Sequence, residues 1–138
     1  MKKVLIISYY WPPAGGIAVH RCLKFAKYLR EFGWEPIICT AENPEYPVLD
    51  EGNFKDIPNG VEILKTKIWE PYNLFKFITG KKKKERIHNV FIEEEKPSFS
   101  HKLGVWIRGN IFIPDARKFW IRPSAKFLSK YLKENPVD

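Results

Sequence analysis

The 138-residue chain has few of the residues that mark several classes of protein. Its two cysteines, Cys22 and Cys39, form no CxxC pair, which argues against a disulfide scaffold or a zinc site and fits a reducing, cytoplasmic compartment. Its three histidines are too scattered to suggest a metal site. No run approaches the roughly 18 apolar residues that a membrane span needs. The short apolar run after Met1 meets Pro12 and Pro13 without a cleavage site, so we expect no secretory signal peptide.

The residues that are present suit one globular domain spanning residues 1–138. Hydrophobic residues make up 44% of the chain and aromatic residues 15%, which is enough for a core. The net charge of +8 is uneven, because residues 1–68 carry +1 and residues 69–138 carry +7. A lysine run in the second half follows several large aromatic residues and consists of Lys81, Lys82, Lys83 and Lys84. An anionic neighbour is therefore expected.

The first forty residues predict a strand, a loop, a helix and a second strand. Residues 4–8 form a branched apolar run typical of a buried parallel strand, and the prolines and glycines of residues 9–16 predict a loop. Residues 17–29 have apolar positions at helical spacing, and Gly33 stands where a helix-capping glycine belongs. Residues 35–40 predict the second strand. This order indicates a βαβ unit with parallel strands.

The rest of the chain extends this pattern. Residues 41–60 predict a long surface connection, residues 61–66 a third strand, residues 73–79 a short helix, and residues 101–113 and 123–134 further helices, the last with Pro123 in its first turn. We therefore expect an α/β fold, with a Rossmann-like, doubly wound parallel sheet that is an incomplete, truncated N-terminal half of a larger fold. In the expected strand order 3-2-1-4, a missing fourth strand leaves the first strand at an edge. We expect this edge to self-associate with a second copy or to be covered by a later segment.

The loop between the first strand and the first helix holds the candidate binding residues Gly15, Gly16, His20 and Arg21. Glycines allow a ligand to approach the backbone, and the free amides of a helix start favour anionic oxygens. An equally weighted alternative is that both glycines merely permit a tight turn. The three spaced glycines of a dinucleotide-binding loop are missing, so we expect no NAD and no other cofactor.

The same segment carries a family resemblance. Residues 3–7, the sequence Tyr-Tyr-Trp-Pro-Pro, the glycine pair, Arg21 and residues 25–29 together resemble the N-terminal domain of family-four glycosyltransferases, which have the GT-B architecture of two Rossmann-like domains. Pro114, Asp115 and Trp120 are similar to the members of that family that build bacterial surface polysaccharides. The resemblance covers residues 1–40 and 111–138.

The resemblance implies a retaining transfer of sugar from a nucleotide-sugar donor to a polysaccharide or lipid-linked acceptor, without an obligatory metal. It implies that Gly15 and Gly16 face the donor diphosphate and the reacting sugar, with His20 and Arg21 carried over less directly. In that family, the residues that contact the nucleotide belong to the second domain, and nothing in this chain matches them. The chain alone is therefore expected to be an inactive acceptor-side domain of an enzyme, and we expect no catalytic residue within it.

Two further sets of charged residues have competing interpretations. Glu93, Glu94 and Glu95 are interpreted as a solvated patch, and Asp115 as a helix cap in preference to a base acting on an acceptor hydroxyl. The lysine run is either a solvated loop or a peripheral contact with the anionic inner face of a membrane. A non-enzymatic basic module that binds an anionic membrane or nucleic acid remains the alternative function. Nucleic acid ranks last because no binding motif is present.

Overall fold

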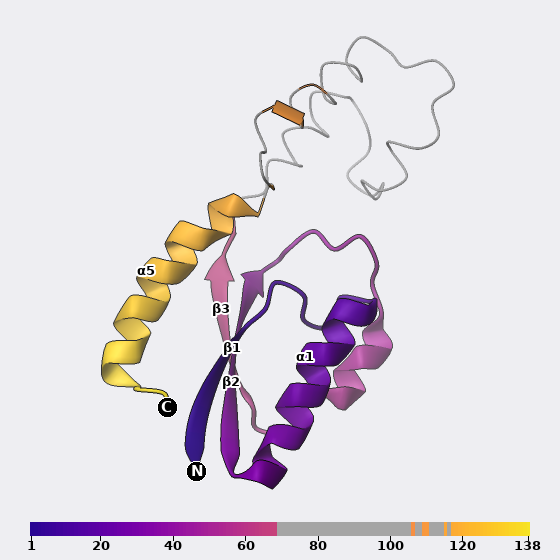
Figure 1. Ribbon diagram of the computed structural model, residues 1–138. Helices are drawn as coiled ribbons and strands as arrows, with labels where there is room; N and C mark the ends of the chain where they lie inside the picture. The colour runs from indigo at the N-terminus through magenta and orange to yellow at the C-terminus, as the bar shows by residue number, and fades with distance from the viewer. Residues whose placement is uncertain (69–105, 107–108, 111–114, 116) are drawn as a thin grey trace. The chain divides into compact units, whose positions relative to one another are not determined.

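The computed structural model describes residues 1–68, 106, 109, 110, 115 and 117–138. Three strands, β1 (Lys2–Ile7), β2 (Trp34–Glu42) and β3 (Glu62–Lys67), form a parallel sheet in the order β1-β2-β3 (Figure 1). The helices are α1 (Ile17–Tyr28) and α5 (Lys118–Glu134), with two short 3-10 helices, η1 (Leu29–Phe32) and η2 (Glu51–Asp56). The predicted α/β class and parallel sheet are confirmed. The arrangement is compatible with a Rossmann-like fold.

Residues of the strands alternate between two cores. Ile6 of β1, Ile38 of β2 and Ile63 of β3 belong to a core shared with α1, which contributes Val19, Leu23 and Ala26. The neighbouring residues Leu5, Cys39 and Leu64 belong to a second core with Trp120 and Leu128 of α5. Because successive residues of a strand point to opposite faces, α1 and α5 cover opposite faces of the sheet. Burial raises the pKa of the Cys39 thiol, so this cysteine is a packing residue.

The corner where the first helix turns back into the sheet matches the prediction. Gly33 adopts the left-handed conformation with φ of 78° and ends η1, a position that favours glycine. Arg30 donates from Nε to the Glu35 carboxylate at 2.9 Å and from Nη1 to the Asn59 carbonyl at 2.6 Å. The hydrogen bond from Arg30 lowers the pKa of Glu35. These contacts join η1, β2 and the turn before β3.

The predicted start of the last helix is wrong. We expected residues 123–134 with Pro123 in the first turn, whereas α5 begins at Lys118 and holds Pro123 in its interior. Proline lacks the N–H that would reach the fourth preceding carbonyl, so one helical hydrogen bond is lost. Trp120, which precedes Pro123, is buried against the sheet and favours a helix that begins before the proline. The helices predicted over residues 73–79 and 101–113 lie outside the described residues, except for positions 106, 109 and 110.

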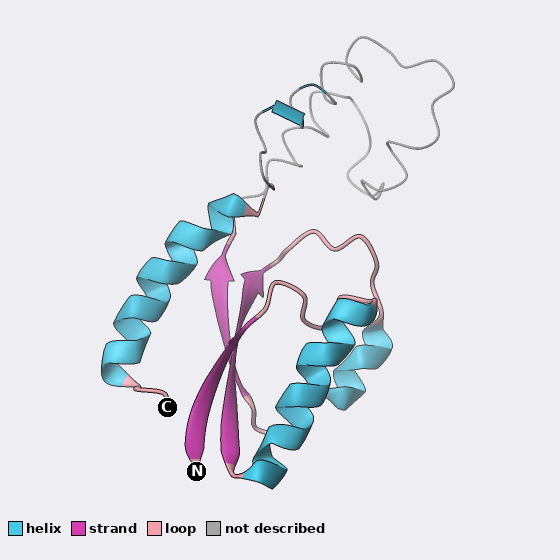
Figure 2. Ribbon diagram, in the orientation of Figure 1, coloured by secondary structure: helices cyan, strands magenta, loops and turns pink. Residues whose placement is uncertain are grey.

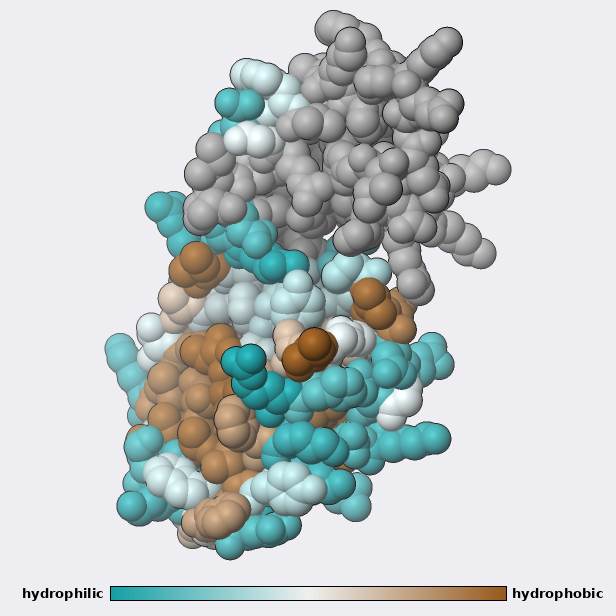
Figure 3. Space-filling view, turned by 45° about the vertical axis from the view of Figure 1, so that its right-hand side comes forward, coloured by the Kyte–Doolittle hydropathy of each residue, from teal (hydrophilic) through white to brown (hydrophobic). Residues whose placement is uncertain are grey.

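Among the residues that the structure describes, few pair with the outer edge of β1. The Asp138 N–H donates to the Lys3 carbonyl at 3.0 Å, and the Lys3 N–H donates to Asp138 Oδ2 at 2.9 Å. No other residue in the described part of the chain pairs with this edge. Ile7 is 57% exposed, and the face drawn in Figure 3 carries a broad apolar patch. Within the described sheet, β1 lies at an edge, as predicted. A later residue covers only its first part.

Candidate functional site

The carboxyl ends of the parallel strands carry two loops that hold each other in place. Residues 8–16 follow β1 and residues 43–50 follow β2, and both lie at the end to which the strands point (Figure 2). Gly15 N–H donates to the Val48 carbonyl at 2.9 Å, and Asp50 N–H donates to the Pro13 carbonyl at 2.8 Å. The buried Asn53 side chain of η2 donates to the Ala14 carbonyl at 2.8 Å. In parallel α/β sheets this end is where ligands bind.

Aromatic side chains support the first loop from the side of α5. The Tyr9 ring meets those of Tyr10, Tyr46 and Trp120 edge-on, with centroids 5.1, 5.6 and 6.1 Å apart. The Tyr46 hydroxyl donates to the Tyr9 carbonyl at 3.0 Å. Such edge-to-face pairs are each worth about 0.5–1.5 kcal/mol beyond the area they bury. The aromatic run that the family resemblance highlights therefore has a structural task in this chain, which is to shape the loop.

The two glycines of the loop have different environments. A side chain at Gly15 would place its Cβ 2.8 Å from Val48 Cγ1 and 3.3 Å from Asp50 Cβ. Because the Gly15 amide is already bonded to Val48, this glycine is needed for the contact between the two loops. A Cβ at Gly16 would meet nothing within 4 Å. Of the two glycines, Gly16 is the one beside open space.

Gly16 also begins α1 in a conformation that other residues avoid. Its φ is 91° and its ψ is 172°, a region essentially restricted to glycine. It offers no side chain to cap the helix, and the first turn of α1 contains no acidic residue. The Val19 N–H donates to the Gly16 carbonyl at 3.3 Å. The first amides of α1, those of Ile17 and Ala18, are thus the ones that can meet an anionic group, which the positive end of the helix dipole also favours.

His20 and Arg21 lie one turn into α1, and both are exposed. Within the described residues, neither side chain has a hydrogen bond or an ion pair. Their positions leave them available to an anion at Gly16, but they do not converge with groups from the other strand ends. The site consists of Gly16 and the start of α1, with Gly15 as part of its scaffold.

The remaining predicted residues divide into two groups. Asp115 accepts hydrogen bonds from the Arg117 N–H at 3.0 Å and from its guanidinium at 3.1 Å, which fits a turn before α5 better than a base. The lysine run from Lys81 to Lys84 and the glutamates Glu93, Glu94 and Glu95 lie outside the described residues. In the described ranges, no three acidic, histidine or cysteine side chains come together as a metal site. No described helix is long and apolar enough to cross a membrane.

Sequence reasoning missed the residues that hold the loop from outside. Tyr46, Asp50 and Asn53 fall in the long connection after β2, where neither periodicity nor a motif marks them. Their role depends on the antiparallel bridge between Ala14 and Leu49, which joins segments far apart in the chain.

Comparison with known proteins gives no family. The chain matches no protein-family model, no curated protein and no solved structure.

Proposed function

We propose that this chain is the N-terminal, acceptor-side domain of a retaining glycosyltransferase that uses a nucleotide-sugar donor and a polysaccharide or lipid-linked acceptor. The observation that carries the proposal is Gly16, which leaves open space beside an uncapped helix start at the carboxyl end of a parallel sheet. A diphosphate oxygen could occupy that space and accept hydrogen bonds from the first amides of α1. The family resemblance of residues 1–40 supplies the reaction class.

Within this proposal the chain provides only part of the donor site. Gly16 meets the diphosphate, Gly15 fixes the loop against residues 48–50, and Arg21 and His20 add positive charge or hydrogen bonds nearby. The nucleotide would be held mainly by a second domain, so this chain alone neither transfers nor hydrolyses sugar. Donor binding to the chain alone is then weak, with a dissociation constant of about a millimolar or weaker.

The experiment is a titration of the isotope-labelled chain with UDP-glucose, GDP-mannose and inorganic pyrophosphate, followed by amide NMR. We expect saturable shifts that are largest at the amides of Gly16, Ile17 and Ala18. Pyrophosphate should reproduce them, because the diphosphate is the recognised group. Shifts spread over the whole basic surface would contradict the proposed site. Micromolar affinity of this chain for a nucleotide sugar would contradict the proposal that a second domain provides most of the donor binding.

A pair of glycine variants separates binding from backbone strain. Gly16→Ala and Gly33→Ala both place a methyl group at positive φ with nothing within 4 Å, so both should lower stability. Only Gly16→Ala should also abolish the pyrophosphate shifts. Equal binding by the two variants would reduce Gly16 to a structural turn.

A further inference from the structure

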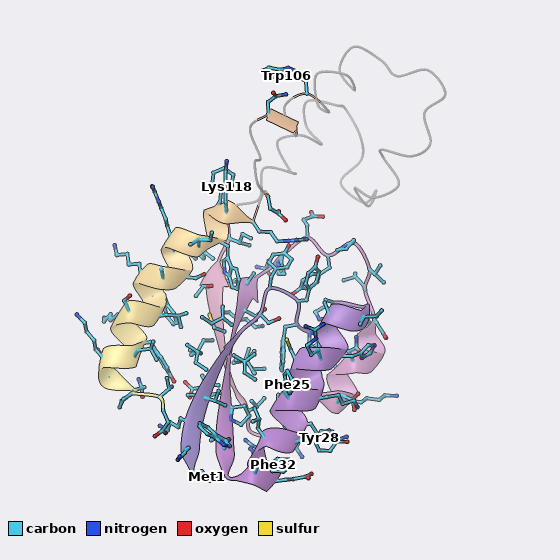
Figure 4. All side chains as sticks on the ribbon, viewed as in Figure 1. Met1, Phe25, Tyr28, Phe32, Trp106 and Lys118 are labelled. Carbon is cyan, nitrogen blue, oxygen red and sulfur yellow. The ribbon has the colours of Figure 1, made fainter. Side chains whose placement is uncertain are left out.

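Helix α1 carries large apolar side chains on the side turned away from the sheet as well as on the core side. Val19, Leu23 and Ala26 are buried. The other side, with its continuation in η1, exposes four large residues to solvent: Ile17 at 85%, Phe25 at 56%, Tyr28 at 44% and Phe32 at 76%. Figure 4 labels Phe25, Tyr28 and Phe32 along the second half of α1 and η1. Their spacings of eight, three and four residues keep the series on one side of a helix.

Positive charge lies among these apolar groups. Arg21, Lys24 and Lys27 alternate with them, and α1 itself contains no acidic residue. We call Ile17, Arg21, Lys24, Phe25, Lys27, Tyr28 and Phe32 the outer face of α1.

The acidic residues nearest to this face offset only part of its charge. Asp56 of η2 lies 3.4 Å from Lys24 Nζ and 3.7 Å from Lys27 Nζ, and the hydrogen bond from Lys24 lowers the pKa of Asp56. Glu31 is the only acidic residue of η1. Exposed pairs such as these are worth little, so the lysines can exchange Asp56 for another anion. Arg21 has no acidic partner among the described residues.

The mixture of side chains indicates the kind of partner. Lysine is depleted in the centres of protein–protein interfaces, whereas here Lys24 precedes Phe25 and Lys27 precedes Tyr28. At a bilayer surface the same mixture is favourable, because apolar and aromatic groups enter the headgroup region while cations remain beside lipid phosphates. Lys27 Nζ already lies 5.9 Å from the centroid of the Tyr28 ring.

We propose that the outer face of α1 binds the surface of an anionic lipid bilayer, with the helix lying parallel to that surface. Ile17, Phe25, Tyr28 and Phe32 are the groups that enter the headgroup region, and Arg21, Lys24 and Lys27 contact lipid phosphates. The proposal does not depend on the sugar-transfer proposal, although both proposals use Arg21. It also differs from the expectation for the lysine run. The residues of the outer face of α1 are all described by the structure, whereas the lysine run lies outside the described residues.

The experiment is sedimentation of the full chain with vesicles of equal parts phosphatidylglycerol and phosphatidylcholine, compared with vesicles of phosphatidylcholine alone. The variant Phe25→Ser/Phe32→Ser removes two exposed apolar groups from the outer face. Its matched control is Ile121→Ser/Phe127→Ser, which removes two exposed apolar groups from α5. We expect the first variant to lower the partition coefficient for anionic vesicles about tenfold or more and the control to change it less than about twofold. Far-UV circular dichroism checks that both variants are folded.

Charge variants test the second half of the proposal. Arg21→Gln should weaken binding about fivefold and flatten its salt dependence, whereas Arg122→Gln on α5 should have little effect. Replacing Lys81, Lys82, Lys83 and Lys84 by Gln tests the lysine run in the same assay. The proposal is overturned if the parent chain does not bind anionic vesicles, if neutral vesicles bind as well, or if only the lysine-run variant loses binding. None of these outcomes bears on pyrophosphate binding at Gly16.

Discussion

The two faces of the sheet are covered in different ways. On one face, α1 comes from the connection between adjacent strands β1 and β2, and its core of Val19, Leu23, Ala26 and Ile38 is apolar. On the other face, α5 comes from a distant part of the chain and is attached partly by hydrogen bonds. Trp120 Nε1 donates to Thr66 Oγ1 at 2.6 Å, and Thr66 Oγ1 lies 2.9 Å from Ser124 Oγ.

The difference shows how each helix is specified. Helix α1 directly connects two adjacent strands, so the connection already limits where the helix can pack, and an apolar stripe is enough to bind it to the sheet. A helix that arrives after a long excursion needs contacts that fix its position, and directional hydrogen bonds between buried groups do so. Two buried tryptophans of the described residues illustrate the difference. The Trp120 indole N–H on the α5 side has a hydrogen-bond partner, whereas the Trp11 indole N–H on the α1 side has none among these residues.

The largest expected effect comes from removing the same side chain on each face. Leu23→Ala should lower the free energy of unfolding by about 2–5 kcal/mol, because Leu23 is fully buried and its truncation leaves a cavity in the core. Leu128→Ala should cost less because Leu128 is less completely buried, at 6% exposed. Urea unfolding followed by circular dichroism measures both. A larger loss of unfolding free energy for Leu128→Ala than for Leu23→Ala would contradict this expectation.

Replacing each buried tryptophan by phenylalanine isolates the hydrogen bond. Trp120→Phe leaves Thr66 and Ser124 without the indole donor and should cost about 1–3 kcal/mol more than Trp11→Phe, which removes an N–H that has no partner in the described ranges. Urea unfolding again provides the measurement. Equal costs would mean that volume alone determines both contacts.

High pH should weaken the α5 face selectively. Burial, together with the hydrogen bond from its hydroxyl to Glu62 Oε1 at 2.7 Å, raises the pKa of Tyr131 from 10 to about 12. The folded state therefore holds this proton more tightly than the unfolded state, so the stabilisation is complete below pH 10 and is lost between pH 10 and about 12. The free energies of unfolding of the parent chain and of Tyr131→Phe, measured as a function of pH, should converge over that range. A constant difference between the two proteins across this pH range would show that the ionisation of Tyr131 does not affect stability.

The smallest expected effect is on amide hydrogen exchange at the outer edge of β1, where the two faces of the sheet meet. Lys2 and Ser8 donate their amides toward β2, whereas Lys3 donates away from it. By alternation, the amides of Leu5 and Ile7 face the open edge. Hydrogen exchange should be faster at Leu5 and Ile7 than at Val4 and Ile6. Protection of Leu5 and Ile7 that increases with protein concentration would instead indicate pairing with a second copy.

Much of the first face could be predicted from the sequence. The apolar run of β1, the spacing of Val19, Leu23 and Ala26, and the capping Gly33 are each local patterns with a single satisfactory structure. The position of Gly16 at the start of α1 was also predictable, because the chain must turn there from strand to helix.

The second face and the division of labour between the glycines required the tertiary structure. No local pattern connects Thr66 with Trp120, or Gly15 with Val48, because each pair is joined only when distant segments pack together. The start of α5 was mispredicted for the same reason, since a local rule for Pro123 ignores the buried anchor at Trp120. By itself the sequence determined the βαβ unit and where its loop lies. Only packing between distant segments decided which glycine supports that loop and which one faces open space.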